Sequence, residues 1–107
     1  MLQIQTLVIQ FASSLQLQLA AVEARDAKFA DQLRRSLLSV GSNLGEGSGA
    51  TGGAKRKAYR VARAEAGELE MGLEMAVALG YCALSVQQRE TLQRILATLQ
   101  KLARPHR

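Results

Sequence analysis

The chain has 107 residues, enough for one domain with a single core but too few for two. Hydrophobic residues make up 48% and charged residues 21%, which excludes a disordered tail or a fibrous repeat for the chain as a whole. The net charge of +5 permits a polyanion partner such as nucleic acid. We therefore expect residues 1–107 to form one basic domain.

The residue types favour an all-α fold. The sequence contains 17 leucines and 17 alanines, the two strongest apolar helix formers. Aromatic residues make up only 4%, and the single proline is Pro105. A β-sandwich or barrel would need more β-branched and aromatic residues and more frequent turns.

The first expected helix is uncharged. Apolar residues recur every three or four positions from Ile4 to Val22, which predicts a helix over residues 2–22. All charged residues lie at or after Glu23. Where a solvated helix would carry charge, the face opposite the apolar stripe carries three apolar residues: Leu2, Ile9 and Leu17. We interpret this face as an oligomer interface, with a solvated glutamine-rich face as the alternative.

The remaining apolar periodicity predicts three further helices, at residues 27–46, 54–79 and 86–103. Between the first two of these, the glycine-rich run Gly45–Gly53 predicts a turn. Ser85 and Gln88 have the spacing of a capping box, which predicts the start of the last helix. Four helices with short connections predict an antiparallel up-down four-helix bundle.

Two sets of polar residues are expected to meet between the second and third helices. One strip of four residues runs along the second helix: Arg35, Ser39, Asn43 and Glu46. One flank of the third helix carries Arg56, Arg60 and Arg63 and then Glu70 and Glu74. In an antiparallel hairpin the charges match by sign, with Glu46 and Asn43 level with Arg56 to Arg60 and Arg35 level with Glu70. We expect a structural hydrogen-bonded network there.

Glycines inside the second helix also need an explanation. Gly41 and Gly45 each cost roughly 0.8 to 1 kcal/mol relative to alanine. We expect another backbone to approach the helix closely at these two positions. Early fraying of the helix is the alternative.

The candidate nucleic-acid contacts are basic residues of the third and fourth helices: Lys55, Arg56, Lys57, Arg60, Arg63, Arg94, Lys101 and Arg104. No base-reading motif accompanies them, so we expect weak contacts to backbone phosphates with little sequence preference. Alternatively, Arg60 and Arg63 serve the structural network and the others form a solvated face.

Nothing in the sequence indicates catalysis, a cofactor or a metal. The chain has one histidine, His106, and one cysteine, Cys82, and it lacks the Glu-x-x-His pairs of di-iron bundles. The order of Gly47–Gly53 and Lys55 does not match a phosphate-binding P-loop. No apolar run is long enough to span a bilayer, and we expect a cytoplasmic protein without a membrane partner.

Residues Ser39–Gly47 resemble the S-[IV]-x-x-N-[IL]-x-E-G signature of the bacterial four helix bundle protein family. This family includes proteins encoded within intervening sequences of 23S ribosomal RNA genes, and it is related to the accessory variability protein of diversity-generating retroelements. Gln32–Arg35 is similar to the family's Q-L-R-R run, and Tyr59–Arg63 with Glu68–Glu70 is similar to its third helix. Departures include Gly45 for the usual alanine and Glu65 for a small serine.

The resemblance implies a four-helix protomer without enzyme activity that assembles as a ring, often a pentamer. Its structural signature corresponds here to Ser39, Asn43, Glu46 and Gly47, and we group Arg35 with them. We therefore expect an oligomeric accessory to an RNA or retroelement process that binds RNA or DNA weakly. The alternative is an oligomeric scaffold that binds a protein partner, such as a reverse transcriptase, without touching nucleic acid.

Overall fold

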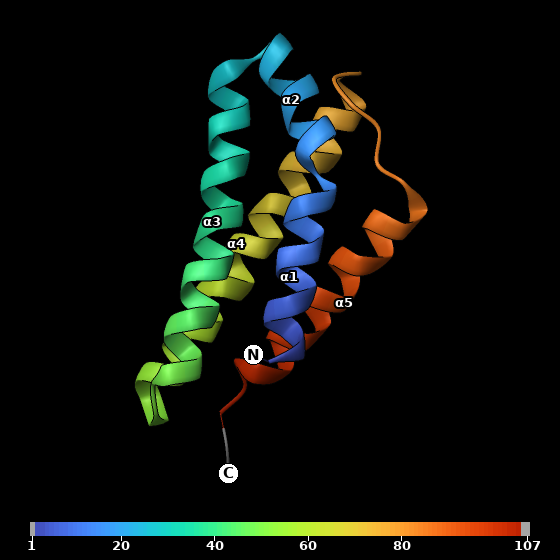
Figure 1. The fold of residues 1–107 in the computed structure, drawn as a ribbon. Coiled ribbons are helices and arrows are strands. Elements are labelled where there is room, and N and C mark those ends of the chain that lie inside the picture. Colours follow the sequence, from blue (N-terminus) through green and yellow to red (C-terminus); the bar gives the residue numbers. More distant parts are fainter. Residues whose placement is uncertain (1, 106–107) are drawn as a thin grey trace.

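The computed structural model describes residues 2–105, so Met1 and His106–Arg107 lie outside the described part. Within that range the ordered elements are five helices, arranged as a bundle of 45 × 25 × 22 Å (Figure 1): α1 Gln3–Ser14, α2 Gln16–Arg25, α3 Ala27–Gly49, α4 Gly52–Ala78 and α5 Val86–Leu102. The all-α prediction is confirmed. The predicted number of four helices is wrong, because the first expected helix is divided at Leu15.

The break at Leu15 has an identifiable cause. The helices α1 and α2 meet at an angle of 48° without a proline. The Ser14 hydroxyl donates to the Phe11 carbonyl at 2.7 Å, and the Gln88 side chain on α5 donates to the Ser14 carbonyl at 2.9 Å. Side-chain bonds of this kind compete with the helical hydrogen bonds and bend the helix. Leu15 itself is fully buried, so the bend carries its side chain into the core.

The long helices α3 and α4 form an antiparallel pair joined by Ala50–Thr51 (Figure 1). The Asp26 side chain caps the start of α3 by accepting from the Phe29 backbone N–H at 3.0 Å. Both helices extend farther into the glycine-rich run than expected, and only two residues remain between them. After α4, Gly80 adopts a φ of 77°, the left-handed conformation that ends many helices.

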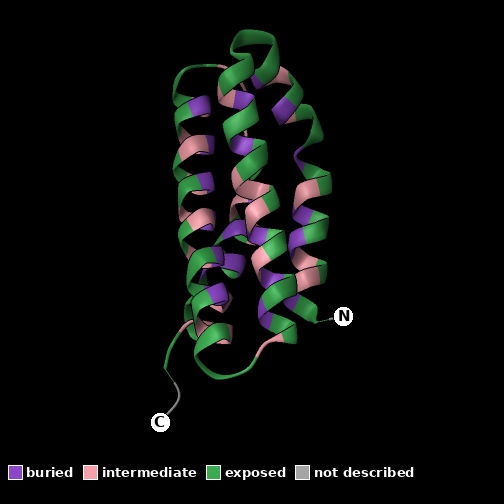
Figure 2. Ribbon diagram, turned by 90° about the vertical axis from the view of Figure 1, so that its left-hand side faces the viewer, coloured by how far each residue is buried: buried purple, intermediate pink, exposed green. Residues whose placement is uncertain are grey.

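The core lies along the inward stripes of all five helices, which Figure 2 shows in purple. The apolar stripe predicted from Ile4 to Val22 is buried, and α3 likewise buries Leu33, Val40 and Leu44. The predicted capping box of α5 is confirmed, since Ser85 and Gln88 exchange side-chain to backbone hydrogen bonds of 2.9 and 3.0 Å. Local periodicity and local capping therefore identified most of the core.

Helix α4 approaches α3 closely at Gly47, and not at the two glycines where a close approach was expected. A side-chain Cβ added at Gly41 or Gly45 would meet nothing within 4 Å, so the prediction of a close backbone there is wrong for the protomer. A Cβ at Gly47 would lie 2.6 Å from the ring of Tyr59 on α4. At the other end of the pair, a Cβ at Gly72 of α4 would lie 2.6 Å from Leu33 of α3. These two glycines allow α3 and α4 to pack closely.

We expect Gly47→Ala to destabilise the protein by about 1 to 3 kcal/mol, because the added methyl group must displace the buried Tyr59 ring. The control is Gly41→Ala in the same helix, which adds the same methyl group in open space and should stabilise the helix by about 0.8 to 1 kcal/mol. Urea unfolding followed by circular dichroism measures both. Equal effects of the two substitutions would contradict the packing argument.

Candidate nucleic-acid interface

Three arginines meet in a groove between α4 and the chain just after α5. Arg60 and Arg63 come from the first half of α4, and Arg104 follows the end of α5. The groove has a volume of about 300 Å³ and is completed by Gln100, Ala103 and Pro105. We call it the arginine groove. It lies at the end of the bundle where α4 begins and α5 ends (Figure 1).

The arginine groove lacks a negative charge within the described chain. Across residues 2–105, the ion pairs join Arg34 to Glu23 and Asp31, and Arg89 to Glu74. The Nε of Arg63 is buried and has no hydrogen-bond partner among these residues. A buried donor without an acceptor is uncommon.

Three further basic residues, Lys55, Arg56 and Lys57, occupy the first turns of α4. Lys57 is exposed, and the other two are half-buried. Arg56 lies four residues before Arg60, so both share one side of the helix. The amino end of a helix also favours negative charge, which adds to the attraction of this end for an anion.

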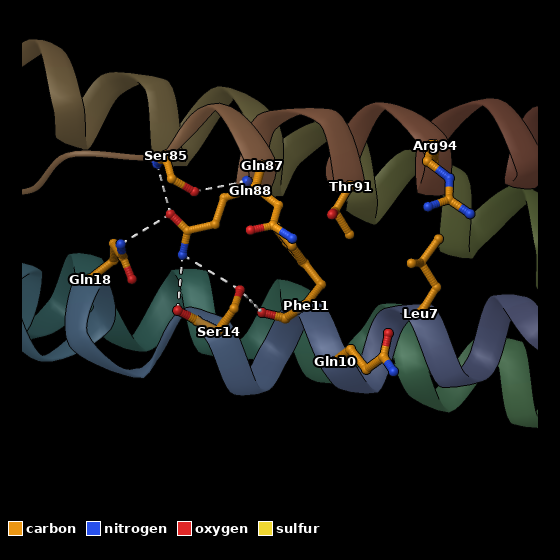
Figure 3. Close-up of a pocket in the computed structure, with 10 residues that line it drawn as sticks. All are labelled: Leu7, Gln10, Phe11, Ser14, Gln18, Ser85, Gln87, Gln88, Thr91 and Arg94. Atoms are coloured by element: carbon orange, nitrogen blue, oxygen red, sulfur yellow. Dashed lines mark hydrogen bonds between the residues drawn. The ribbon is translucent and has the colours of Figure 1, made fainter.

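Two of the predicted contacts lie elsewhere. Arg94 is on the side of α5 that faces α1, where it lines a groove with Leu7 (Figure 3). Lys101 is exposed seven residues later on the same face of α5. The structure therefore brings Arg60, Arg63 and Arg104 together but directs Arg94 away from them.

The predicted network between α3 and α4 is wrong. Glu74 pairs with Arg89, and Glu70 accepts a hydrogen bond from Gln93. Both partners are on α5, because the flank of α4 that carries these carboxylates faces α5 and not α3. Arg35, which was expected opposite Glu70, instead lines a groove of about 360 Å³ between α3 and α4.

The signature residues act locally within α3. The Asn43 side chain donates to the Ser39 carbonyl at 2.9 Å and to the Ser39 hydroxyl at 3.2 Å, and not to an arginine of α4. Glu46 is exposed and belongs to none of the ion pairs among residues 2–105. Gly47 is buried beneath Tyr59. The signature therefore shapes the end of α3 and its packing on α4.

A model of the 23S rRNA-intervening sequence protein family matches residues 2–104. The chain belongs to this family. The match spans all five helices and confirms the resemblance found at the signature. No curated protein and no solved structure shows significant similarity to the chain.

One groove of this member of the 23S rRNA-intervening sequence protein family was not expected from the sequence. It lies between α1 and α5, has a volume of about 490 Å³ and is lined mainly by glutamine, serine and threonine (Figure 3). Gln18 donates to the carbonyls of Ala83 and of the Gln88 side chain, each at 3.1 Å. The bonds around Gln88 hold α5 against the bend between α1 and α2. The recurrence of glutamine at positions 10, 18, 87 and 88 was the available sequence signal.

Among residues 2–105, His, Cys, Asp and Glu form no group of three that could hold a metal ion. Burial raises the pKa of the Cys82 thiol, which disfavours the reactive thiolate. Within the same range no single helix could cross a membrane, although α1 and α2 together have sufficient length and apolar composition despite their bend.

Two neighbouring carboxyl groups of α4, Glu65 and Glu68, interact on the α3 side. A hydrogen bond that the protonated Glu68 carboxyl donates to Glu65, followed by repulsion between the two charges, raises the pKa of Glu68 above its ordinary value of 4.5. Because Glu68 binds its proton more tightly in the folded chain than in the unfolded chain, protonated Glu68 contributes to the free energy of unfolding at low pH. This contribution is lost as the pH rises through the raised pKa of Glu68.

We expect Glu65→Gln to lower the pKa of Glu68 toward its ordinary value, since the two largest of the three causes of the shift come from Glu65. A carboxyl NMR titration measures the change directly. Glu90→Gln, which removes an exposed carboxylate on α5, is the control and should leave the pKa of Glu68 unchanged. An unaltered Glu68 titration in Glu65→Gln would show that the two groups do not interact.

Proposed function

We propose that this protein is a non-enzymatic, homo-oligomeric helical bundle that binds nucleic acid weakly through phosphate contacts, as an accessory to an RNA or retroelement process in the cytoplasm. The observation that carries the proposal is the arginine groove. Arg60 and Arg63 of α4 and Arg104 from the segment after α5 line it, without a carboxylate partner among residues 2–105. The family name, which refers to an intervening sequence of a ribosomal RNA gene, supports an RNA context.

The chemistry of the groove favours phosphate over bases. Sequence-tolerant binding of single strands usually adds aromatic stacking to electrostatic attraction. Here Phe11 and Tyr59 are buried, and Phe29 packs edge-on against Tyr81, whose ring also lies 5.0 Å from the Arg25 guanidinium. No aromatic ring lines the arginine groove. The arginine side chains would therefore contact nucleic acid through paired guanidinium hydrogen bonds to phosphate oxygens, with little sequence preference.

Assembly is the second part of the proposal. Helix α1 and the part of α2 as far as Val22 carry no charge, and Ile9 and Leu17 are 56% and 84% exposed there. Contiguous exposed apolar surface usually marks an interface. We propose a ring, a pentamer by resemblance, in which α1 and α2 together serve as one bent arm of a four-helix architecture. Repetition of a weak phosphate site around the assembly would raise its avidity.

The uncharged face of α1 also favours a second candidate function. If assembly is the functional property and the arginine groove is exposed to solvent without binding nucleic acid, the oligomer acts as a scaffold for a protein partner such as a reverse transcriptase. The two functions differ in one measurable respect, which is the response of nucleic-acid binding to salt.

We expect the protein at micromolar concentration to bind a labelled duplex or hairpin RNA at about 50 mM salt. On duplex DNA, the logarithm of the association constant should fall against the logarithm of the salt concentration with a slope near −4 to −5 if about five phosphates are contacted. Arg60→Ala with Arg104→Ala should reduce the steepness of that slope by about 2. Changing Lys55, Arg56 and Lys57 together to alanine should weaken binding at every sequence tested. Fluorescence anisotropy across a salt series measures both.

The matched control is Lys28→Ala with Arg35→Ala, which removes the same charge from exposed positions on α3. This pair should leave the slope almost unchanged. Equal losses in the two double variants would show that net charge and not the arginine groove governs binding. No binding by the unaltered protein at low salt would favour the scaffold.

We expect Leu17→Lys to dissociate the assembly to a mass near 11.6 kDa, because the charge would have to be buried in the contact. Leu17 is largely exposed in the protomer, so helicity should be preserved. Light scattering measures the mass, and far-UV circular dichroism measures the helicity. A protomer mass for the unaltered protein at high concentration would overturn the assembly.

A further inference from the structure

A polar groove runs between α1 and α5 over much of their length. The groove of about 490 Å³ shown in Figure 3 adjoins a second groove of about 410 Å³, and three residues line both: Leu7, Gln10 and Arg94. The second groove extends as far as Gln3 on α1 and Thr98 on α5. We call the two together the α1–α5 groove.

Both walls of the α1–α5 groove carry hydrogen-bonding groups that the described chain leaves unused. Gln18 and Gln88 bond to each other at one end of the groove. By contrast, Gln10 and Gln87 are exposed, and their side-chain amides make no hydrogen bond within residues 2–105. A side-chain amide carries the same N–H donor and carbonyl acceptor as a peptide group. These residues can therefore pair with the main chain of an extended peptide.

Arg94 gives the groove a single charge. It is exposed and belongs to none of the ion pairs among residues 2–105. No other charged residue of that range lines either part of the groove. Figure 3 shows the Arg94 side chain reaching from α5 toward Leu7 of α1. An occupant that matches this charge carries one carboxylate opposite Arg94 and is neutral elsewhere.

We propose that the α1–α5 groove binds an extended segment of a partner protein, with one acidic side chain of the segment paired to Arg94. From Gln87 to Thr98, α5 rises about 16 Å, since each helical residue adds about 1.5 Å. About five residues in an extended conformation span that length at 3.3 Å each. The groove continues on both sides of Arg94, so the carboxylate belongs to a side chain within the segment and not to a chain end.

Other classes of ligand fit the groove less well. A duplex carries about one phosphate per 3.4 Å of each strand, and Arg94 alone neutralises only one of the several phosphates that would lie along the groove. An amphipathic helix needs apolar anchor sites. Of the apolar residues that line the groove, Ile4 and Phe11 are buried in the protomer core. Main-chain hydrogen bonds therefore suit this groove better than apolar anchors.

The α1–α5 groove is separate from the surfaces proposed above. Within the described chain it shares no residue with the arginine groove, and none of Leu2, Ile9 and Leu17 lines it. The proposal therefore requires neither nucleic-acid binding nor assembly. It adds a surface and a chemistry by which a protein partner is recognised.

Selection from a displayed library of random nonapeptides tests the proposal, with the unaltered protein and Arg94→Glu as parallel targets. Peptides selected by the unaltered protein should share an aspartate or glutamate at one position. Those selected by Arg94→Glu should carry lysine or arginine there, because the reversed charge repels the acid. A synthetic peptide from the first selection should bind the unaltered protein about two- to fivefold more tightly than its amide analogue, the effect of an exposed ion pair. Arg94→Gln should not distinguish the two peptides.

NMR spectroscopy and further variants locate the bound peptide. The side-chain amide signals of Gln10 and Gln87 should shift when the synthetic peptide is added, and Gln10→Ala or Gln87→Ala should each weaken binding about two- to tenfold. The proposal is overturned by a selection that yields no binding peptide, by peptides without a shared acidic position, or by shifts confined to residues outside the groove. A lower mass of Arg94→Glu than of the unaltered protein in light scattering would assign the groove to a contact between copies and also overturn it.

Lys28→Glu is the matched control. It makes the same change of charge at an exposed position on α3, outside the α1–α5 groove. This variant should select the same peptides as the unaltered protein. Selection of basic peptides by Lys28→Glu would show that net charge governs binding and would overturn the site. Because Arg60 and Arg104 lie outside the groove, the salt series tests nucleic-acid binding separately, and either proposal can fail alone.

Discussion

The close packing of α3 on α4 fixes the rest of the structure. Gly47 lies beneath the Tyr59 ring at one end of the pair, and Gly72 lies beneath Leu33 at the other. Because contact occurs at two points that are 14 residues apart on α3 (Leu33 and Gly47) and 13 residues apart on α4 (Tyr59 and Gly72), α4 can neither tilt nor rotate freely against α3. The rotation of α4 then determines which of its residues meet α5 and which face outward. A residue with a side chain at either glycine would have to change this arrangement.

That rotation divides the charged residues of one helix among three surfaces. Toward α3 lie Glu65 and Glu68, and toward α5 lie Glu70 and Glu74. The first half of α4 directs Arg60 and Arg63 to the end of α5, where no carboxylate of residues 2–105 pairs with them. The basic site in the first half of α4 and the acidic flanks of its second half are thus two consequences of the same packing. Neither requires a sequence motif of its own.

Sequence periodicity predicted what depends on near neighbours along the chain. The apolar stripes and the Ser85–Gln88 capping box are local patterns, and the structure bears them out. Which helix a polar flank faces is not a local property, and so Glu70 was assigned to the wrong neighbour. The break at Leu15 depends on a hydrogen bond between Gln88 and Ser14, which are 74 residues apart. The position of Arg94 likewise follows from the packing of α5 on α1, which its own helix does not reveal.

The separation of surfaces matters for how binding and assembly can be combined. The arginine groove shares no residue with the uncharged outward face of α1, so a contact through that face need not displace a phosphate. A single groove with three guanidinium groups gives only weak, salt-sensitive attraction. Several grooves held in one assembly act on the same strand at high effective concentration, provided that the spacing of the grooves suits the strand. An uncharged helix at one corner of the bundle and an arginine cluster at another can therefore serve one function, in which assembly supplies the affinity that a single protomer lacks.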